Sequence, residues 1–447
     1  MDRDLAMDSQ LTLHDSDALG PTIVPALVQP SSAQFLEKSP KAAAARAIYI
    51  RTLFAGITAI SLVIFGVFFD LLGICMDHTA SHPSRMDSLK DFDGGAVGQS
   101  ISNALSSINP GTNGVVWEVV PASQFPGGIS QLQHAVAQEK TWYALSINSG
   151  ASANLSAAVA AADPSYDPST AVTFMGTEAR NELIFPIHRS IVTGELEAIT
   201  QQFALQFLKN ISSSSNIGTL LSTAPQIVVR PIYYTVDNLR PFDVPVASAV
   251  TFVGLIYLVI LSFFIVMVSN AARDIAGFNE SLSTGSLIRV RIATAFVAYF
   301  FISLFYTLLS RAFQLPFDRH FGRWGIVIFW MLNWTGMLAC GLALESMITL
   351  LTIRFIPFFL ILWIISNVSI TEYPLQVLPH VYHYGFAWPF YNISRAVRSI
   401  VFSTKNDVGL NFGILLGWVG LSCITLSFFQ WFMRRRASAP QAKPVPT

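Results

Sequence analysis

The chain has 447 residues, of which 52% are hydrophobic and only 12% are charged, whereas soluble domains usually carry about 25% charged residues. The uncharged runs are long. No charge occurs between Val244 and Arg273, and a helix needs about 20 apolar residues to cross a bilayer. The composition therefore predicts an integral membrane protein and excludes a chain that is soluble, fibrous or disordered throughout.

Charge is unevenly distributed, although the formal total is zero. The region from Met76 to Pro245 has 8 basic and 14 acidic residues, and the remainder has 19 basic and 13 acidic. An acidic polar region joined to a basic membrane region argues against nucleic-acid binding. The cysteines (Cys75, Cys340 and Cys423) lie in or beside apolar runs, so neither a disulfide framework nor a zinc site is predicted.

Residues 1–47 form a polar tail without hydrophobic periodicity, which predicts disorder. No apolar core follows Met1, as a signal peptide would require. The first transmembrane helix is expected at 52–74, with Asp70 near its outer end. Lysines and arginines cluster just before this span, and the positive-inside rule then places the N-terminus in the cytosol.

A polar region at 75–245 predicts a mixed α/β domain outside the cytosol. Branched and aromatic runs predict strands at 115–120, 141–147, 171–175 and 226–236. Helices are expected at 129–138, 151–162 and 177–210, and Pro186 should bend or split the last one. The sequons at Asn154 and Asn210 are candidate glycosylation sites of this domain.

The rest of the chain predicts a membrane domain at 246–433. Its five spans are expected at 246–268, 292–311, 325–344, 355–370 and 412–433. A basic tail at 434–447 opens with three arginines and is placed in the cytosol. The predicted fold is thus a polytopic α-helical membrane protein. It has six transmembrane helices and an α/β domain inserted between helices 1 and 2.

Two predicted outer loops depart from the positive-inside rule, because both are basic (Arg311, Arg319 and Arg323; Arg395, Arg398 and Lys405). The second belongs to the segment 371–404, which is too polar and too rich in proline to span. From Pro389 onward its apolar residues fall on one helical face and its polar residues on another. This pattern predicts an amphipathic or re-entrant helix that carries Arg395 and Arg398.

Motifs for ATP hydrolysis, zinc proteases, serine hydrolases and redox dithiols are absent from the sequence. No enzymatic activity, cofactor or metal site is therefore expected. Ionisable groups near lipid are costly and often mark function, which makes Asp70, Glu345 and Arg354 candidate coupling residues. The alternative is that they lie at the membrane interface and are solvated. Four uncharged polar residues are expected to bond neighbouring helices: Asn333, Thr335, Ser366 and Asn367.

Several stretches carry a family resemblance: DFDGGAVG (91–98), DNLRPFDVPVASAVTFVGLIYL (237–258), FDRHFGRWGIVIFWMLNWTGMLACGLALE (317–345) and the stretch at 367–419. Over about 50–433 the chain resembles the fungal nitrosoguanidine-resistance membrane proteins. Their layout is similar to that of type-2 ABC exporter permeases and of the bacterial phage-infection-protein family. One departure concerns the stretch before DFDGG, where Leu89 is the only aliphatic residue after Met86. The first strand of the domain is therefore either divergent or missing.

The resemblance implies a fungal protein of the plasma membrane, or of another membrane of the secretory pathway, linked to resistance against toxic compounds. The leading hypothesis is transport of a drug, secondary metabolite or lipid, with Asp70 and Glu345 as candidates for proton coupling. Membrane lipids, a second copy of the chain, and a separate ATPase or other membrane protein are the expected partners. The alternative is a scaffold or regulator that transports nothing and whose polar domain binds a partner or organises the bilayer.

Overall fold

The computed structural model describes residues 87–108, 115–376 and 378–437, together with positions 40, 43, 44, 47 and 51. The described residues from 87 onward belong to one compact unit, within Ala59–Thr447, and the account below concerns this unit. The predicted first span at 52–74, its Asp70, and Cys75 lie outside the described residues.

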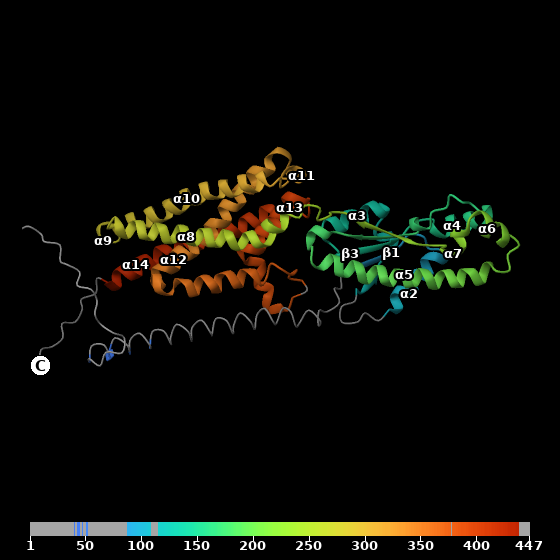
Figure 1. Cartoon of the computed structure of the whole chain (residues 1–447), viewed down its shortest axis with the longest axis horizontal. Coiled ribbons are helices and arrows are strands. Elements are labelled where there is room, and N and C mark those ends of the chain that lie inside the picture. Colours follow the sequence, from blue (N-terminus) through green and yellow to red (C-terminus); the bar gives the residue numbers. More distant parts are fainter. Residues whose placement is uncertain are drawn as a thin grey trace, which may run out of the picture. The chain divides into compact units, whose positions relative to one another are not determined.

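A five-stranded sheet organises residues 87–240, here called the sheet domain (Figure 1). The strands are β1 (Asp87–Asp91), β2 (Trp117–Val119), β3 (Tyr143–Ile147), β4 (Val172–Gly176) and β5 (Tyr234–Asn238). Their order is β2-β1-β3-β4-β5, and all neighbours are parallel except β3 and β4. The helices are α2 (Ala96–Ser107), α3 (Gly128–Ala137), α4 (Ala151–Ala161), α5 (Ile184–Ile211), α6 (Ile217–Thr223) and α7 (Pro225–Val229), with 3-10 turns η1 (Ala122–Gln124), η2 (Pro168–Thr170) and η3 (Glu178–Arg180).

The first strand of the domain is divergent in sequence but present in the structure. β1 lies between β2 and β3, and Leu89 at its centre is fully buried. The turn that follows is held by two carboxylates. Asp91 accepts the backbone N–H of Gly94, and Asp93 accepts that of Gly98. Polar side-chain bonds to the turn thus offset the lack of apolar residues before it.

Two details of the predicted sheet domain are corrected. Residues 226–236 do not form one strand, because Pro225 occupies the first position of α7 and the strand starts only at Tyr234. Pro186 neither bends nor splits a helix. Helix α5 begins at Ile184, so Pro186 lies in the first turn, where no backbone N–H has a partner within the helix.

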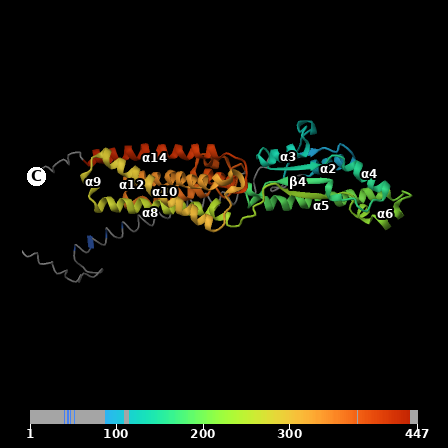
Figure 2. The ribbon, with the colours of Figure 1, turned by 90° about the horizontal axis from the view of Figure 1, so that it is seen from above.

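The remaining helices form a bundle in which α8, α10, α12 and α14 run side by side (Figures 1 and 2). The bounds are η4 (Ala249–Val253, a π-turn), α8 (Gly254–Ile275), α9 (Phe278–Ser281), α10 (Thr284–Ala312), α11 (Asp318–Phe321), η5 (Gly322–Trp324), α12 (Gly325–Val368), η6 (His380–Ala387), α13 (Pro389–Phe402) and α14 (Val408–Ala437). Among the described residues, four helices are long and apolar enough to cross a membrane: Ala249–Ile275, Thr284–Ala312, Asp318–Val368 and Val408–Arg436.

Helix α12 contains two of the predicted spans. Its backbone leaves the helical region at Thr352, with φ 65° and ψ 170°. A Cβ on Gly336, before this point, would touch Ile393 of α13, and Asn367, after it, accepts the backbone N–H of Phe390. Both segments therefore reach α13, so the chain turns back at Thr352. The segments correspond to the expected spans 325–344 and 355–370.

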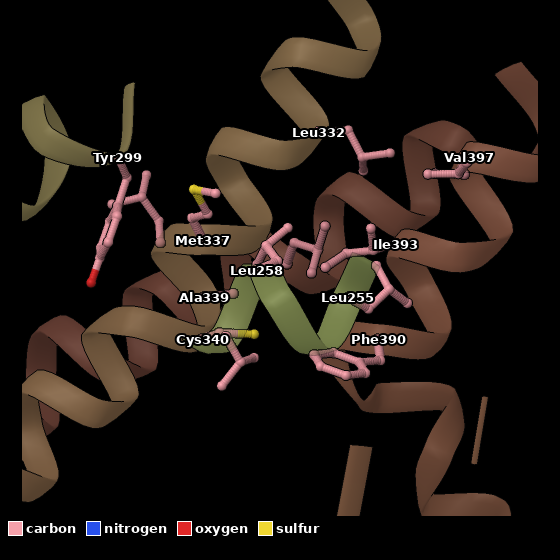
Figure 3. Close-up of a cluster of buried hydrophobic side chains, with 14 of the residues drawn as sticks. Leu255, Leu258, Tyr299, Leu332, Met337, Ala339, Cys340, Phe390, Ile393 and Val397 are labelled. Carbon is pink, nitrogen blue, oxygen red and sulfur yellow. The ribbon is translucent and has the colours of Figure 1, made fainter. Parts of the chain in front are cut away.

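Small residues let the helices approach closely around α13. Figure 3 shows side chains of α8, α12 and α13 meeting in one apolar cluster that includes Leu258, Met337 and Ile393. The backbone of Gly341 lies against the hydroxyl end of Tyr299 from α10.

Four polar residues were expected to form hydrogen bonds between helices. Ser366 and Asn367 bond the segment 371–404, whereas Asn333 and Thr335 bond the backbone of their own helix.

Candidate functional site

A network of buried polar side chains joins all four long helices of the bundle. Arg273 of α8 and Arg291 of α10 both pair with the same carboxylate oxygen of Glu345, at N–O distances of 2.8 and 2.7 Å. Arg291 also donates to the side chain of Gln430 on α14, at 2.5 Å. We call these four residues the bundle network. They connect α8, α10, α12 and α14.

The bundle network is enclosed by protein. The side chains of Arg273, Arg291 and Glu345 are each at most 6% exposed, and Gln430 is buried as well. Glu345 is therefore not the solvated interface residue of the alternative interpretation. Arg354 is exposed and lies two residues after the turn at Thr352. With two guanidinium groups and one carboxylate, the network holds one excess positive charge.

The bundle network lies far from the sheet domain along the helices. The backbone carbonyl of Thr251 accepts from Ser394 of α13, and Arg273 follows 22 residues later on nearly continuous helix. At 1.5 Å per residue this separation is about 33 Å. Near the network, Arg434 of α14 donates to the carbonyls of Asn279 and Leu282 and fixes the connection between α8 and α10.

A second group of charges lies where α13 meets the sheet domain. The helix starts at Pro389, as predicted, but both of its faces are covered, and twelve of its fourteen residues are buried. On its polar face Arg395 pairs with Glu139 at 2.5 Å and with Asp407 at 3.1 Å. Arg398 pairs with Glu182 at 2.5 Å and donates to the carbonyl of Ala179.

Arg180 completes this junction from the side of the sheet domain. Its guanidinium lies 3.5 Å from the centre of the Trp142 ring and 3.7 Å from Glu139. Burial lowers the pKa of Arg180 to about 10, while the carboxylate of Glu139 acts in the opposite direction. The group therefore stays a cation at neutral pH.

These contacts give partners to three of the six basic residues in the loops that departed from the positive-inside rule. Arg395 and Arg398 pair with acids of the sheet domain, and Arg319 pairs with Asp243 just after it, at 2.7 Å. The acidic excess of the polar region and the basic excess of the bundle thus meet at their junction. A paired arginine is a weaker signal of membrane orientation than a free one, because its charge is already compensated.

Sequence reasoning identified Glu345 of the bundle network, and Arg395 and Arg398 of the junction, but not their partners. Arg273 and Arg291 fall between the expected spans 246–268 and 292–311. Glu139 and Glu182 were not singled out. The candidate glycosylation residues Asn154 and Asn210 are exposed, on α4 and α5.

Comparison of the sequence with known proteins shows the family of this chain. The family model described as "Protein of unknown function (DUF3533)" matches residues 59–424. The chain belongs to this family. It is also similar to a Saccharomyces cerevisiae protein named "uncharacterized endoplasmic reticulum membrane protein YJR015W", with 27% identity over 312 residues. That alignment covers 67% of this chain and 61% of the yeast protein, so the chain spans less than two thirds of this relative. No solved structure gives a significant match.

The comparisons confirm the coarser part of the family prediction, a membrane protein with fungal relatives. The exporter-like layout and the link to nitrosoguanidine resistance stay predictions.

Proposed function

We propose that this protein transports an amphipathic compound, namely a drug, a secondary metabolite or a lipid, across its membrane. The observation that carries the proposal is the bundle network. Burying three charges among apolar helices costs free energy, and such groups in membrane proteins usually line pathways or hold alternative conformations. Because the network contacts all four long helices, any rearrangement of the bundle at this end must break some of its bonds.

The geometry favours a role of Glu345 in holding helices together. The carboxylate lies between two guanidinium groups from different helices, and both pair with the same oxygen. We therefore assign Glu345 the role of holding α8, α10 and α12 together until the substrate or a partner protein opens this end.

Transport is tested with the purified full-length protein in liposomes that carry an imposed proton gradient, using fluorescent phospholipids and a nitrosoguanidine as probes. Wild-type protein is expected to move at least one probe faster than empty liposomes do, and Glu345→Gln to change that rate by tenfold or more. Arg289→Gln is the matched control, because it removes an exposed charge from α10, the helix that carries Arg291. Failure of the wild-type protein to move any probe would count against transport.

A scaffold is the second candidate, and the junction at α13 favours it. Ion pairs fix this helix to the sheet domain, and tight packing fixes it to the bundle, which suits a rigid platform. If the protein is a scaffold, the wild-type chain should change membrane order or retain a partner, and it should move no probe across the liposome membrane. Transport that depends on Glu345 would decide against it.

We further propose a membrane of the secretory pathway, with both chain ends in the cytosol. The name of the yeast relative gives the endoplasmic reticulum as the location of that protein, and the plasma membrane is the alternative for this chain. The sequence has no P-loop, so a separate ATPase or an ion gradient would supply the energy for transport. A second copy of this chain would complete the transport pathway. Imaging of a fluorescently tagged chain distinguishes the two membranes.

A further inference from the structure

A small cavity lies at the junction of the sheet domain, the segment 371–376 and α13. Its volume is about 40 Å³. The lining includes Trp142, and all of its charged residues are arginines: Arg180, Arg395 and Arg398. This cavity is separate from the bundle network, and the proposed function does not use it.

The charged groups that line the cavity wall are three guanidinium groups. Their side chains are between 6% and 19% exposed, so water screens them weakly. The carboxylates that pair with them, Glu139, Glu182 and Asp407, balance their charge but are not among the lining residues. A bound anion would therefore meet guanidinium groups without first meeting a carboxylate.

Trp142, another lining residue of the cavity, has an unused hydrogen-bond donor. Its side chain is 5% exposed, and its indole N–H has no hydrogen-bond partner among the described residues. A buried donor without an acceptor is unfavourable, so a ligand oxygen that accepts this bond would stabilise the site. The guanidinium of Arg180, stacked at 3.5 Å over the same ring, holds the indole in place.

We propose that this cavity binds the phosphate group of an anionic amphiphile, with the apolar tail outside the cavity. A water molecule needs roughly 10–15 Å³ of such volume, so 40 Å³ holds about three water-sized atoms. That size suits the oxygens of one phosphoryl group and excludes an entire drug. Arginine is well suited to phosphate because its planar fork donates two parallel hydrogen bonds.

The test measures binding to the full-length protein in detergent micelles by isothermal titration calorimetry. The probes are dihexanoylphosphatidic acid, dihexanoylphosphatidylcholine and inorganic phosphate. Trp142→Phe removes the indole N–H but keeps a ring under Arg180, and Arg180→Gln removes one guanidinium. Arg230→Gln is the matched control, because Arg230 also stacks on an aromatic ring and pairs with a glutamate, but on an exposed surface.

Saturable binding of phosphatidic acid is expected, weakened at least tenfold by Trp142→Phe and Arg180→Gln and unchanged by Arg230→Gln. Inorganic phosphate that binds equally well, with the same dependence on Trp142, would support the oxyanion site and assign it to a free anion. The proposal is overturned if neither anion binds saturably, or if both variants bind like the wild-type protein. None of these outcomes depends on whether the protein transports anything.

Discussion

Single residues of the DFDGGAVG stretch show how a weak strand is stabilised by the turn that follows it. Asp91 and Asp93 accept backbone N–H groups of the turn, and Asp93 also accepts the N–H of Ser152 at the start of α4. The side chain of Ser152 in turn accepts the N–H of Val97. These bonds join β1, α2 and α4, which explains why two acids occur together here.

Gly98→Ala should destabilise the sheet domain. A Cβ at this position would overlap the carboxylate of Asp91, which is itself fixed by the turn. Overpacking of this kind costs about 1–3 kcal/mol, to be measured as a loss in the free energy of unfolding. Gly218→Ala on α6 is the control, because nothing lies within 4 Å of its added Cβ. Equal stability of the two variants would refute the assignment.

Lys90 should make stability depend on alkaline pH. It is 1% exposed on β1, and burial lowers its pKa from 10.5 to about 8. Between these two values the unfolded chain holds a proton that the folded chain has lost, so stability should rise with pH across this window. Lys90→Met should remove that rise. Unfolding measured at pH 7.5 and pH 10 checks it, and identical pH responses of both proteins would contradict it.

The sequence revealed which residues carry charge next to lipid but not which residues they contact. Glu345 was identifiable because it ends an apolar run. Its partners Arg273 and Arg291 come from two other helices, and no periodicity in one sequence tells which sides of distant helices face each other. The same limit hid Glu139 and Glu182, which became partners of α13 only through the fold of the sheet domain.

At the scale of elements, the sequence predicted that α13 starts at Pro389 and that it has one apolar and one polar face. Both features follow from local signals, namely proline at the first helical position and the 3.6-residue period of apolar residues. The covering of both faces was not predicted, since the polar face is buried by another domain. The reversal at Thr352 was expected only as a gap between spans. Its positive φ is a tertiary feature, without a glycine or an asparagine to mark it.

Arg395→Gln should destabilise the junction far more than Arg319→Gln does. Arg395 pairs with Glu139, whose side chain is 5% exposed. Removing one partner of a buried pair costs about 3–5 kcal/mol, and the loss here should fall at the lower end, because Arg180 stays 3.7 Å from Glu139. Arg319 and Asp243 are 33% and 47% exposed, and exposed pairs contribute at most about 1 kcal/mol. Thermal unfolding in detergent compares the two variants. If both variants lost the same amount of thermal stability, Glu139 would not be held in a buried ion pair.

At the scale of the whole molecule, acidic and basic regions that are distant in sequence meet at one end of the bundle. The bundle network lies about 33 Å away along α8. This separation is close to the thickness of a hydrocarbon core of about 30 Å. We therefore expect the junction and the bundle network to face opposite sides of the membrane, and both proposed functions depend on that arrangement.

Cysteine accessibility in sealed vesicles of known orientation tests this arrangement most directly. In a background without the three native cysteines, Ala157→Cys on α4 and Ser281→Cys on α9 each place one thiol at an exposed position. A maleimide that cannot cross membranes should label one variant from outside the vesicle and the other only after the vesicle is opened. Labelling of both variants from the same side would contradict the account.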